Sequence, residues 1–273
     1  MTTSRATSAQ ELLDWYREMG VDEAVSDTPT DWFALAPKPV PDPGAERPQT
    51  NDPVNRSAAP TRADRSRLFA DMPPSQAAMD ARERARSAGS LDDLEQLLAG
   101  FDGCPLKATA KNMCFARGSP AARVMLIGEA PGRDEDLQGQ PFVGRAGQLL
   151  DKMLGAIGLG SDDVYITNIV YWRPPGNRTP TPQEVQACQP FLERQIELVD
   201  PKVLVFLGGA AAKQMLATSE GIMRLRGKWR DFKAGDAEPR AIATLHPAYL
   251  LRNPVAKRLA WRDLLEIQAA LEG

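Results

Sequence analysis

Short β-rich runs alternate with longer helical segments along the C-terminal two thirds of the chain. The β-rich runs are RVMLIG (123–128), DVYITNIV (163–170), KVLVFLG (202–208) and AIATL (241–245). The spacing of apolar residues between them predicts helices near 145–157, 183–199 and 209–217. This alternation is typical of a parallel sheet with helices on both faces. We therefore predict an α/β fold, a three-layer α/β/α sandwich with a central four-stranded parallel sheet.

The N-terminal part of the chain has a different pattern. An amphipathic period within residues 10–24 predicts one short helix, which we place in residues 1–27; its apolar positions are Leu12, Leu13, Trp15, Tyr16 and Met19. Residues 28–75 hold 10 prolines and keep no hydrophobic period, so we expect a disordered linker. A helical pattern resumes near Ser75, and we place the folded domain at residues 76–273. Ser90 before two aspartates predicts the N-cap of a helix over 91–99.

The charge of the chain is unevenly distributed. A net charge of −3 argues against a polyanionic partner, but residues 201–273 carry 12 Lys/Arg and 7 Asp/Glu, a net charge of +5. Residues 1–100 carry 11 Lys/Arg and 17 Asp/Glu, a net charge of −6. The C-terminal part can therefore face phosphates. Three irregularly spaced cysteines, no apolar leader near Met1 and no apolar run of 18 residues lead us to expect a soluble, cytoplasmic protein.

Polar residues follow three of the four β-rich runs. Gly128 and Glu129 come after the first run, Asn168 lies at the end of the second, and His246 comes just after the fourth. Parallel sheets of this class bind ligands at the carboxyl ends of their strands. We therefore predict a site at this edge of the sheet.

The segment 128–150, GEAPGRDEDLQGQPFVGRAGQLL, predicts an elaborate loop with five glycines at positions 128, 132, 139, 144 and 147. Glycines let backbone N–H groups approach a ligand closely, and the helix that starts after GRAG would point its N-terminus at an anion. The segment is not a Walker A motif, because Gly-Lys-Ser/Thr is missing. Its composition alone is equally consistent with an ordinary βα loop.

Four motifs together resemble the family 4 uracil-DNA glycosylases. GEAPGxDEDxxGxPFVGRAGxLL (128–150) resembles their first motif and HPAYLLRNP (246–254) their second, and the segments at 167–184 (TNIVYWRPPGNRTPTPxE) and 201–213 (PKVLVFLGGAAAK) match between them, in order. The resemblance covers about residues 100–270. It implies an enzyme that hydrolyses the N-glycosidic bond of uracil in DNA and leaves an abasic site for base excision repair. We expect a monofunctional enzyme, because no obvious Schiff-base lysine lies next to the motifs. We also expect a monomer.

Base excision requires a nucleotide to leave the stack, a reader of the uracil edge and a stabiliser of the leaving anion. The resemblance implies that the Phe142 ring stacks on uracil. Stacking of an aromatic side chain on a base contributes ~1–3 kcal/mol to binding. Asn168 offers the donor and the acceptor that the uracil edge needs. His246, the only histidine of the chain, donates to uracil O2 without giving up a proton. A core phenylalanine, a capping asparagine and a structural histidine are the alternatives.

The first loop supplies the remaining candidates for uracil binding and catalysis. Gly128 and Ala130 are assigned to uracil binding. Ala130 stands where another uracil glycosylase family places a water-positioning aspartate, so water activation must differ here. The candidate carboxylates are Glu129, Asp134 and Glu135. Of these, we expect Glu129 at the site and Glu135 as the electrostatic or water-orienting carboxylate.

The second motif predicts the contacts with DNA. Leu250 and Leu251 can fill the gap left by a flipped base, while Arg252 and its basic neighbours Lys257 and Arg258 hold phosphates. A buried helix start with a solvated basic face is the alternative. A second basic group can extend this surface, at Arg224, Arg226, Lys228 and Arg230.

The resemblance also implies a [4Fe–4S] cluster on four cysteines, but the corresponding positions read Phe101, Cys104, Trp172 and Cys188. Neither Phe nor Trp can ligate iron, and Cys114 matches no ligand position of the family. We therefore expect no metal and no cofactor. Phe101 and Trp172 are expected to fill the vacated volume as a hydrophobic plug, because protein interiors do not tolerate large voids.

Two other functional classes stay open at this point. The first is a non-catalytic DNA-binding module derived from a glycosylase. The second is a protein that binds a mononucleotide phosphate with its glycine-rich loop, which would leave the HPAYLLR segment without a function.

Overall fold

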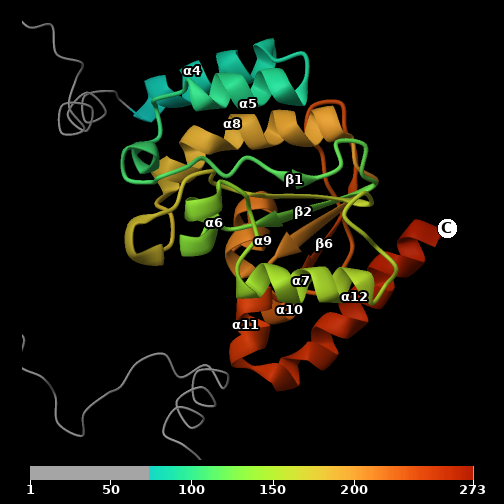
Figure 1. Cartoon of the computed structure of the whole chain (residues 1–273). Helices are drawn as coiled ribbons and strands as arrows, with labels where there is room; N and C mark the ends of the chain where they lie inside the picture. Colours follow the sequence, from blue (N-terminus) through green and yellow to red (C-terminus); the bar gives the residue numbers. More distant parts are fainter. Residues whose placement is uncertain (1–73, 273) are drawn as a thin grey trace, which may run out of the picture. The chain divides into compact units, whose positions relative to one another are not determined.

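The computed structural model describes residues 74–272 (Figure 1). The predicted helix within residues 1–27 lies outside the described residues, as does the predicted linker up to residue 73. The described part starts with α4 (Pro74–Ser87), so the helical pattern near Ser75 does form a helix. None of the helices in the described part is long and apolar enough to cross a membrane.

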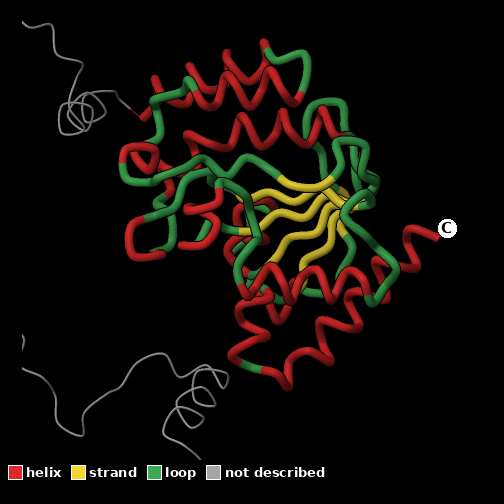
Figure 2. Tube along the Cα trace, in the orientation of Figure 1, coloured by secondary structure: helices red, strands yellow, loops and turns green. Residues whose placement is uncertain are grey.

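A six-stranded sheet forms the centre of the fold, with the strand order β1-β3-β2-β4-β6-β5 (Figure 2). The four central strands are parallel, as predicted: β2 (Val124–Gly128), β3 (Val164–Asn168), β4 (Val203–Leu207) and β6 (Arg240–Thr244). Two antiparallel edge strands flank them, β1 (Arg117–Gly118) and β5 (Arg230–Asp231). These edge strands were not predicted, because two residues are too few to show a period.

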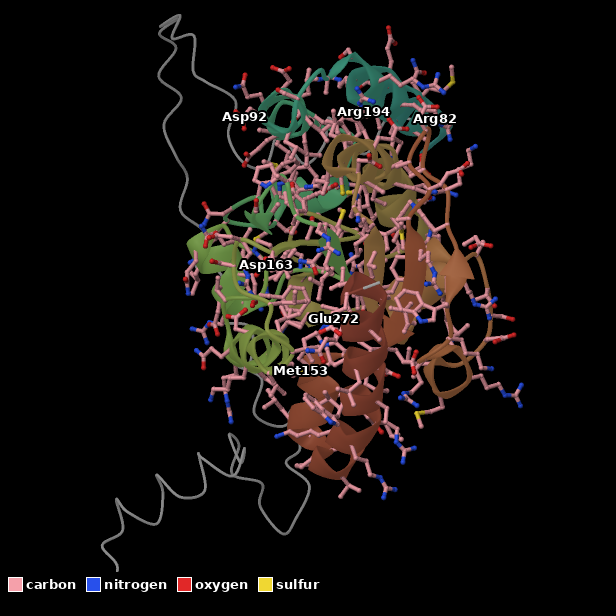
Figure 3. The ribbon with its side chains drawn as sticks, turned by 90° about the vertical axis from the view of Figure 1, so that its right-hand side faces the viewer. Arg82, Asp92, Met153, Asp163, Arg194 and Glu272 are labelled. Atoms are coloured by element: carbon pink, nitrogen blue, oxygen red, sulfur yellow. The ribbon has the colours of Figure 1, made fainter. Side chains whose placement is uncertain are left out.

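Helices cover both faces of the sheet, which confirms the predicted sandwich (Figure 1). One layer contains α4, α5 (Leu91–Ala99) and α8 (Pro182–Val199). The opposite layer contains α7 (Arg145–Gly155) and α12 (Lys257–Glu272). In the perpendicular view, Arg194 of α8 lies in the first layer and Met153 of α7 in the second (Figure 3).

Shorter helices and turns complete the described part of the chain. They are α6 (Arg133–Gln138), α9 (Gly209–Met215), α10 (Ile222–Leu225), α11 (Pro247–Arg252) and the 3₁₀ turns η1 (Pro105–Ala108), η2 (Pro175–Asn177) and η3 (Pro254–Ala256). The helices predicted near 145–157, 183–199 and 209–217 are therefore α7, α8 and α9. The predicted N-cap is confirmed as well, because the Ser90 side chain accepts from the Asp93 backbone N–H at 3.1 Å.

Two hydrophobic cores separate along the strands because successive side chains point to opposite faces. In β2, Met125 and Ile127 face the core under α4, α5 and α8, whereas Val124 and Leu126 face the core under α7 and α12. All five residues of each of β2, β3 and β4 are buried. Continuous burial is why these strands read as apolar runs without alternation.

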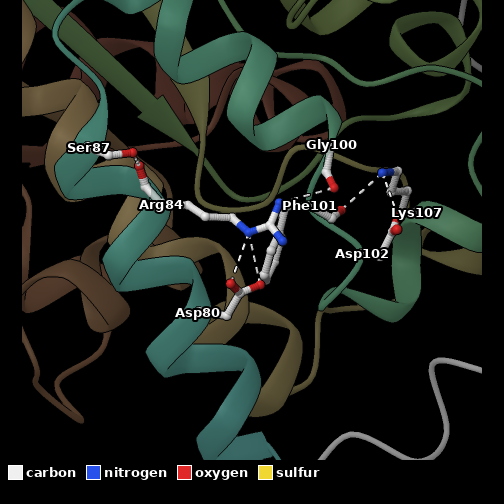
Figure 4. A network of polar contacts seen from close by, with 7 residues as sticks. All are labelled: Asp80, Arg84, Ser87, Gly100, Phe101, Asp102 and Lys107. Atoms are coloured by element: carbon white, nitrogen blue, oxygen red, sulfur yellow. Dashed lines mark hydrogen bonds and ion pairs between the residues drawn. The ribbon is translucent and has the colours of Figure 1, made fainter.

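Polar contacts fasten α4 and α5 to the turn that follows them (Figure 4). Arg84 of α4 donates from Nε to the Asp80 carboxylate at 3.0 Å and from Nη1 to the Gly100 carbonyl at 3.3 Å. Its guanidinium carbon lies 6.0 Å from the ring centroid of Phe101. Lys107 donates to the Phe101 carbonyl at 3.1 Å. These contacts fix the backbone of the turn at Phe101, whose side chain is fully buried.

Candidate active site

A cavity of about 480 Å³ lies at the carboxyl ends of the four parallel strands. Each strand, or the loop that follows it, contributes lining residues: Glu129 and Phe142 after β2, Asn168 at the end of β3, Gly208 after β4 and His246 after β6. The structure therefore brings together the polar groups predicted to share this edge. Ala130 and Glu135 also line the cavity.

Phe142 and His246 are neighbours in this cavity. Their ring centroids are 5.7 Å apart and their planes differ by 31°. Phe142 has a positive φ of 55°, an unusual conformation for a bulky residue. Gly147 lies directly behind it, and a Cβ at this position would fall 1.7 Å from the Phe142 carbonyl oxygen. Gly147 must therefore be glycine if Phe142 is to keep this conformation.

Asn168 shares the cavity floor with Phe142, and Gly128 makes this approach possible. A Cβ on Gly128 would lie 2.4 Å from Asn168 Oδ1 and 2.5 Å from the Phe142 ring atom Cζ. The Asn168 side chain is buried, and its Oδ1 is the one buried side-chain N or O atom in the described part of the chain that has no hydrogen-bond partner. An unpaired buried acceptor costs ~1–3 kcal/mol. This oxygen is therefore available to a donor on a ligand.

His246 is held in one tautomer by its position at the N-cap of α11. Its Nδ1 accepts from the Ala248 backbone N–H at 3.1 Å, so the proton of the neutral ring is on Nε2. Burial, followed by the charge of Arg252, lowers the pKa of His246 to about 4, although the carboxylate of Glu135 opposes this shift. The ring is therefore a neutral hydrogen-bond donor at physiological pH.

The two acidic residues of the first loop have different surroundings. Glu129 is half-buried and lines the cavity. The Glu135 carboxylate accepts three backbone N–H groups of its own loop, from Gly132 at 3.1 Å, Val143 at 3.0 Å and Gly144 at 2.9 Å.

The predicted DNA contacts in the second motif divide into one buried and two exposed residues. Leu251 and Arg252 are exposed. Leu250 is only 1% exposed and belongs to a hydrophobic cluster with Leu245 and Ala260. The prediction that Leu250 contacts DNA is therefore wrong for this structure, because successive residues of a helix point in different directions. Leu250 anchors α11 instead.

The second basic group is also only partly available to DNA. Arg224, Lys228 and Arg230 are exposed. Arg226 is largely buried and donates from Nε to Asp263 Oδ2 at 3.1 Å, so its prediction as a DNA-facing residue is wrong. The carboxylate partner lies on α12, which the local sequence around Arg226 does not indicate.

Sequence reasoning missed several residues that line the cavity, among them Asn177, Arg178, Gly208 and Tyr249. Arg178 is oriented by a bidentate ion pair with Glu184, at 2.9 and 2.6 Å. Asn177 and Arg178 belong to the RPPGNRTPT segment after β3, which the motif comparison singled out without a role. Gly208 has a φ of 94°, and a Cβ there would lie 2.9 Å from His246 Cβ.

The four positions that correspond to cluster ligands lie in one buried hydrophobic cluster. Cys104 Sγ and Cys188 Sγ are 3.8 Å apart, and Phe101 packs on Phe191 with 5.2 Å between ring centroids. Only two of the four positions are thiols, so this donor set does not fit a four-thiolate iron–sulfur cluster. Within residues 74–272, no group of three or more His, Cys, Asp or Glu residues is arranged to hold a metal ion.

Cys114 does not complete the set. Its Sγ donates to the Glu135 carbonyl at 3.2 Å, and burial, followed by the charges of Asp136 and Glu135, raises the pKa of its thiol to about 12. Cys114 is buried, but it is not a member of the hydrophobic cluster that contains Cys104 and Cys188.

Residues 115–265 match the model of the Uracil DNA glycosylase superfamily, which is more than half of the chain. The chain belongs to this superfamily. The superfamily region contains every cavity residue named above, from Glu129 to Tyr249. It begins after α4, α5 and the turn that carries Phe101 and Cys104.

Individual relatives within the superfamily are uracil-DNA glycosylases of type 4. The chain is 43% identical to the Type-4 uracil-DNA glycosylase of Archaeoglobus fulgidus, over 60% of this chain and 85% of that protein. It is 44% identical to the one of Thermotoga maritima, over 55% of this chain and 77% of the relative. The chain is 38% identical to the Type-4 uracil-DNA glycosylase of Sulfurisphaera tokodaii, over 66% of this chain and 84% of that protein.

Proposed function

We propose that this protein is a monofunctional uracil-DNA glycosylase, which hydrolyses the bond between uracil and deoxyribose and leaves an abasic site for base excision repair. Membership in the superfamily and the similarity to type 4 enzymes support this function. The observation that carries it is the buried, unpaired Oδ1 of Asn168, beside Phe142 in the cavity that His246 also lines. These three side chains offer an acceptor, an aromatic face and a neutral donor to a single pyrimidine ring.

In the proposed reaction, the nucleotide swings out of the DNA stack and the base enters the cavity. Phe142 stacks on the ring, and the Asn168 amide accepts from uracil N3–H and donates to O4. Cytosine presents an acceptor at N3 and a donor at C4, so it meets the fixed amide with the wrong pattern. Asn168 is thus the specificity residue.

The C1′–N1 bond then breaks, and its electron pair leaves with uracil as an anion whose charge is shared with O2. The Nε2–H group of His246 donates to O2 and stabilises this charge without transferring its proton. Water adds to C1′ of the oxocarbenium-like sugar, and the proton that the water releases balances the charge of uracil. Glu129, half-buried at the cavity, is the proposed carboxylate near the reacting sugar.

DNA is bound beside the cavity by the exposed residues of α11. We assign to Leu251 the role of the wedge that occupies the gap in the stack, and to Arg252 a contact with phosphate. The net charge of +5 over residues 201–273 supports this placement of the DNA.

The proposed enzyme acts without an iron–sulfur cluster, with Phe101 and Trp172 as a hydrophobic plug in its place. Burial of both side chains in the same cluster as Cys104 and Cys188 supports this interpretation. We further propose that it acts as a monomer in the cytoplasm, where its three free cysteines would stay reduced.

The function is tested with an oligonucleotide that contains one uracil, followed by alkali, which breaks the strand at abasic sites. Strand cleavage is expected with uracil but not with cytosine or thymine at the same position. Retarded but uncleaved DNA would favour the non-catalytic binding module. If the DNA is neither retarded nor cleaved, a function in DNA repair is excluded.

A further inference from the structure

The Glu135 carboxylate is enclosed by backbone N–H groups from two separate turns. Its Oε2 accepts from Gly132, the N-cap residue of α6, and its Oε1 accepts from Val143 and from Gly144, the N-cap residue of α7. Hydrogen bonds to an ionised acceptor are stronger than those between neutral groups. Glu135 therefore ties the start of α6 to the start of α7.

Both N-cap glycines leave room beside this carboxylate. A Cβ on Gly132 would lie 2.7 Å from Glu135 Oε2, and a Cβ on Gly144 would lie 2.9 Å from Asp134 Oδ2 and 3.3 Å from Glu135 Oε1. The glycines of the first motif thus make room for an internal carboxylate. The backbone N–H groups of both glycines donate to Glu135, so they are not free to bind a phosphate.

Two of the three N–H groups that donate to Glu135 belong to the residues directly after Phe142, which are Val143 and Gly144. Phe142 holds a positive φ of 55° that an aromatic residue does not adopt without support from its surroundings. Gly147 supports its carbonyl side, and Glu135 fixes the next two backbone N–H groups. The ring is thereby held against His246 and Asn168.

We propose that Glu135 is a positioning residue that sets the stacking face of Phe142, and that it does not orient the attacking water. This inference rests on the proposed function, because it concerns how the same cavity binds uracil. A carboxylate has about four lone-pair sites, and three of those of Glu135 are already used by the loop. Glu135 accordingly contributes to base binding, and its effect on excision passes through Phe142.

The test uses Glu135→Gln with Asp134→Asn as its matched control. Glutamine has the shape of glutamate, but its amide nitrogen is a donor and would face another donor in this loop. Asp134 loses the same charge on the same helix, is exposed, and makes none of these contacts. We expect Glu135→Gln to weaken the binding of free uracil by about tenfold or more, and Asp134→Asn to leave it within about twofold of the wild type.

A double-mutant cycle with Phe142→Ala shows whether Glu135 acts through Phe142. If it does, Glu135→Gln weakens uracil binding in the wild-type background and has no further effect once Phe142 is alanine. The proposal is overturned if Glu135→Gln binds free uracil normally but loses single-turnover excision by the same factor in both backgrounds, since that is the behaviour of a water-orienting group.

A second variant covers the case in which Glu135→Gln does not fold. Gly132→Ala keeps a φ of −88° that alanine adopts readily, and the added Cβ would crowd only the Glu135 carboxylate. A partial loss of uracil affinity that disappears in the Phe142→Ala background supports the proposal, and unchanged affinity contradicts it. If the wild type excises no uracil, the proposed function fails; if it excises uracil and the cycle is additive, only the role of Glu135 fails.

Discussion

The rings of Phe142 and His246 lie 5.7 Å apart between centroids, although they follow different strands, β2 and β6. In the sheet these two strands are separated by β4. The glycine that follows β4, Gly208, allows the close approach of His246, and Gly128 allows that of Phe142 and Asn168. A parallel sheet with glycines at the ends of its strands therefore builds one binding cavity from three distant segments.

Replacement of His246 tests its role in the chemistry. His246→Ala removes the donor to uracil O2, so we expect single-turnover excision to slow by about 10²–10³-fold, as for other donors to a developing anion. The affinity for uracil-containing DNA should change little, because the phosphate contacts remain. Excision is measured by alkali cleavage and affinity by gel retardation. Wild-type rates in this variant would remove His246 from the reaction.

Asn168→Asp should weaken the choice of uracil over cytosine. An ionised aspartate has two acceptors and no donor, so it repels uracil O4 and accepts from the cytosine amino group. We expect a lower excision rate on uracil and measurable excision of cytosine, compared on oligonucleotides that differ only in the target base. Asn168→Gln, which keeps the amide on a longer side chain, is the control. Unchanged selectivity in the aspartate variant would assign base recognition to another group.

The low pKa of His246 predicts a loss of stability in acid. Its folded-state pKa of about 4 lies below its ordinary value of 6.5. Between these two pH values the unfolded chain binds more protons at His246 than the folded protein does. The contribution of His246 to the free energy of unfolding is therefore fully present above pH ~6.5, and up to about 3 kcal/mol of it is lost as the pH falls towards ~4.

The comparison of wild type with His246→Gln isolates this contribution. The difference in Tm between the two proteins should be largest near neutral pH and should narrow as the pH falls through this window. Excision, in turn, should show no acid limb at the ordinary histidine pKa, since the ring is already neutral there. An acid limb near pH 6.5 that disappears with His246→Gln would contradict this.

The hydrophobic plug formed by Phe101 and Trp172 predicts that the wild type binds no iron and that a variant with cysteines at both positions does. Wild-type protein purified anaerobically should be folded, colourless and free of iron. Phe101→Cys together with Trp172→Cys restores the four-thiol set with Cys104 and Cys188, and after incubation with iron and sulfide this variant should gain visible absorbance and bound iron. The single variant Phe101→Cys is the control. Stoichiometric iron and sulfide in the wild type would disprove the plug.

Replacement of the two adjacent leucines of α11, Leu250 and Leu251, should affect different properties: stability in one case and excision in the other. Leu250→Ala opens a cavity in the core and should lower the free energy of unfolding by about 2–5 kcal/mol. Leu251→Ala should leave stability within about 0.5 kcal/mol, as for an exposed position, and should reduce excision from double-stranded DNA more than from single strands. Unfolding in urea and paired excision assays distinguish the two. Equal effects of both substitutions on stability would refute the assignment of Leu251 as a wedge.

Much of the fold could be predicted from the chain alone because its signals are local. The four apolar runs became the four parallel strands, and Ser90 caps the helix that its neighbours predict. Strand burial and helix capping depend on residues within a few positions of each other, so they can be read in order along the sequence. The same holds for the motifs at the strand ends, which named Phe142, Asn168 and His246 before their positions were known.

What only the tertiary structure decided depends on residues far apart in the sequence. The burial of Leu250 and the pairing of Arg226 with Asp263 follow from how α11 and α12 pack, and no local pattern contains that information. The surroundings of Glu135 likewise exist only because the loop folds back on itself and brings Val143 and Gly144 to its carboxylate. The sequence determined which side chains are present at the sheet edge, whereas packing determined which of them are free to meet a ligand.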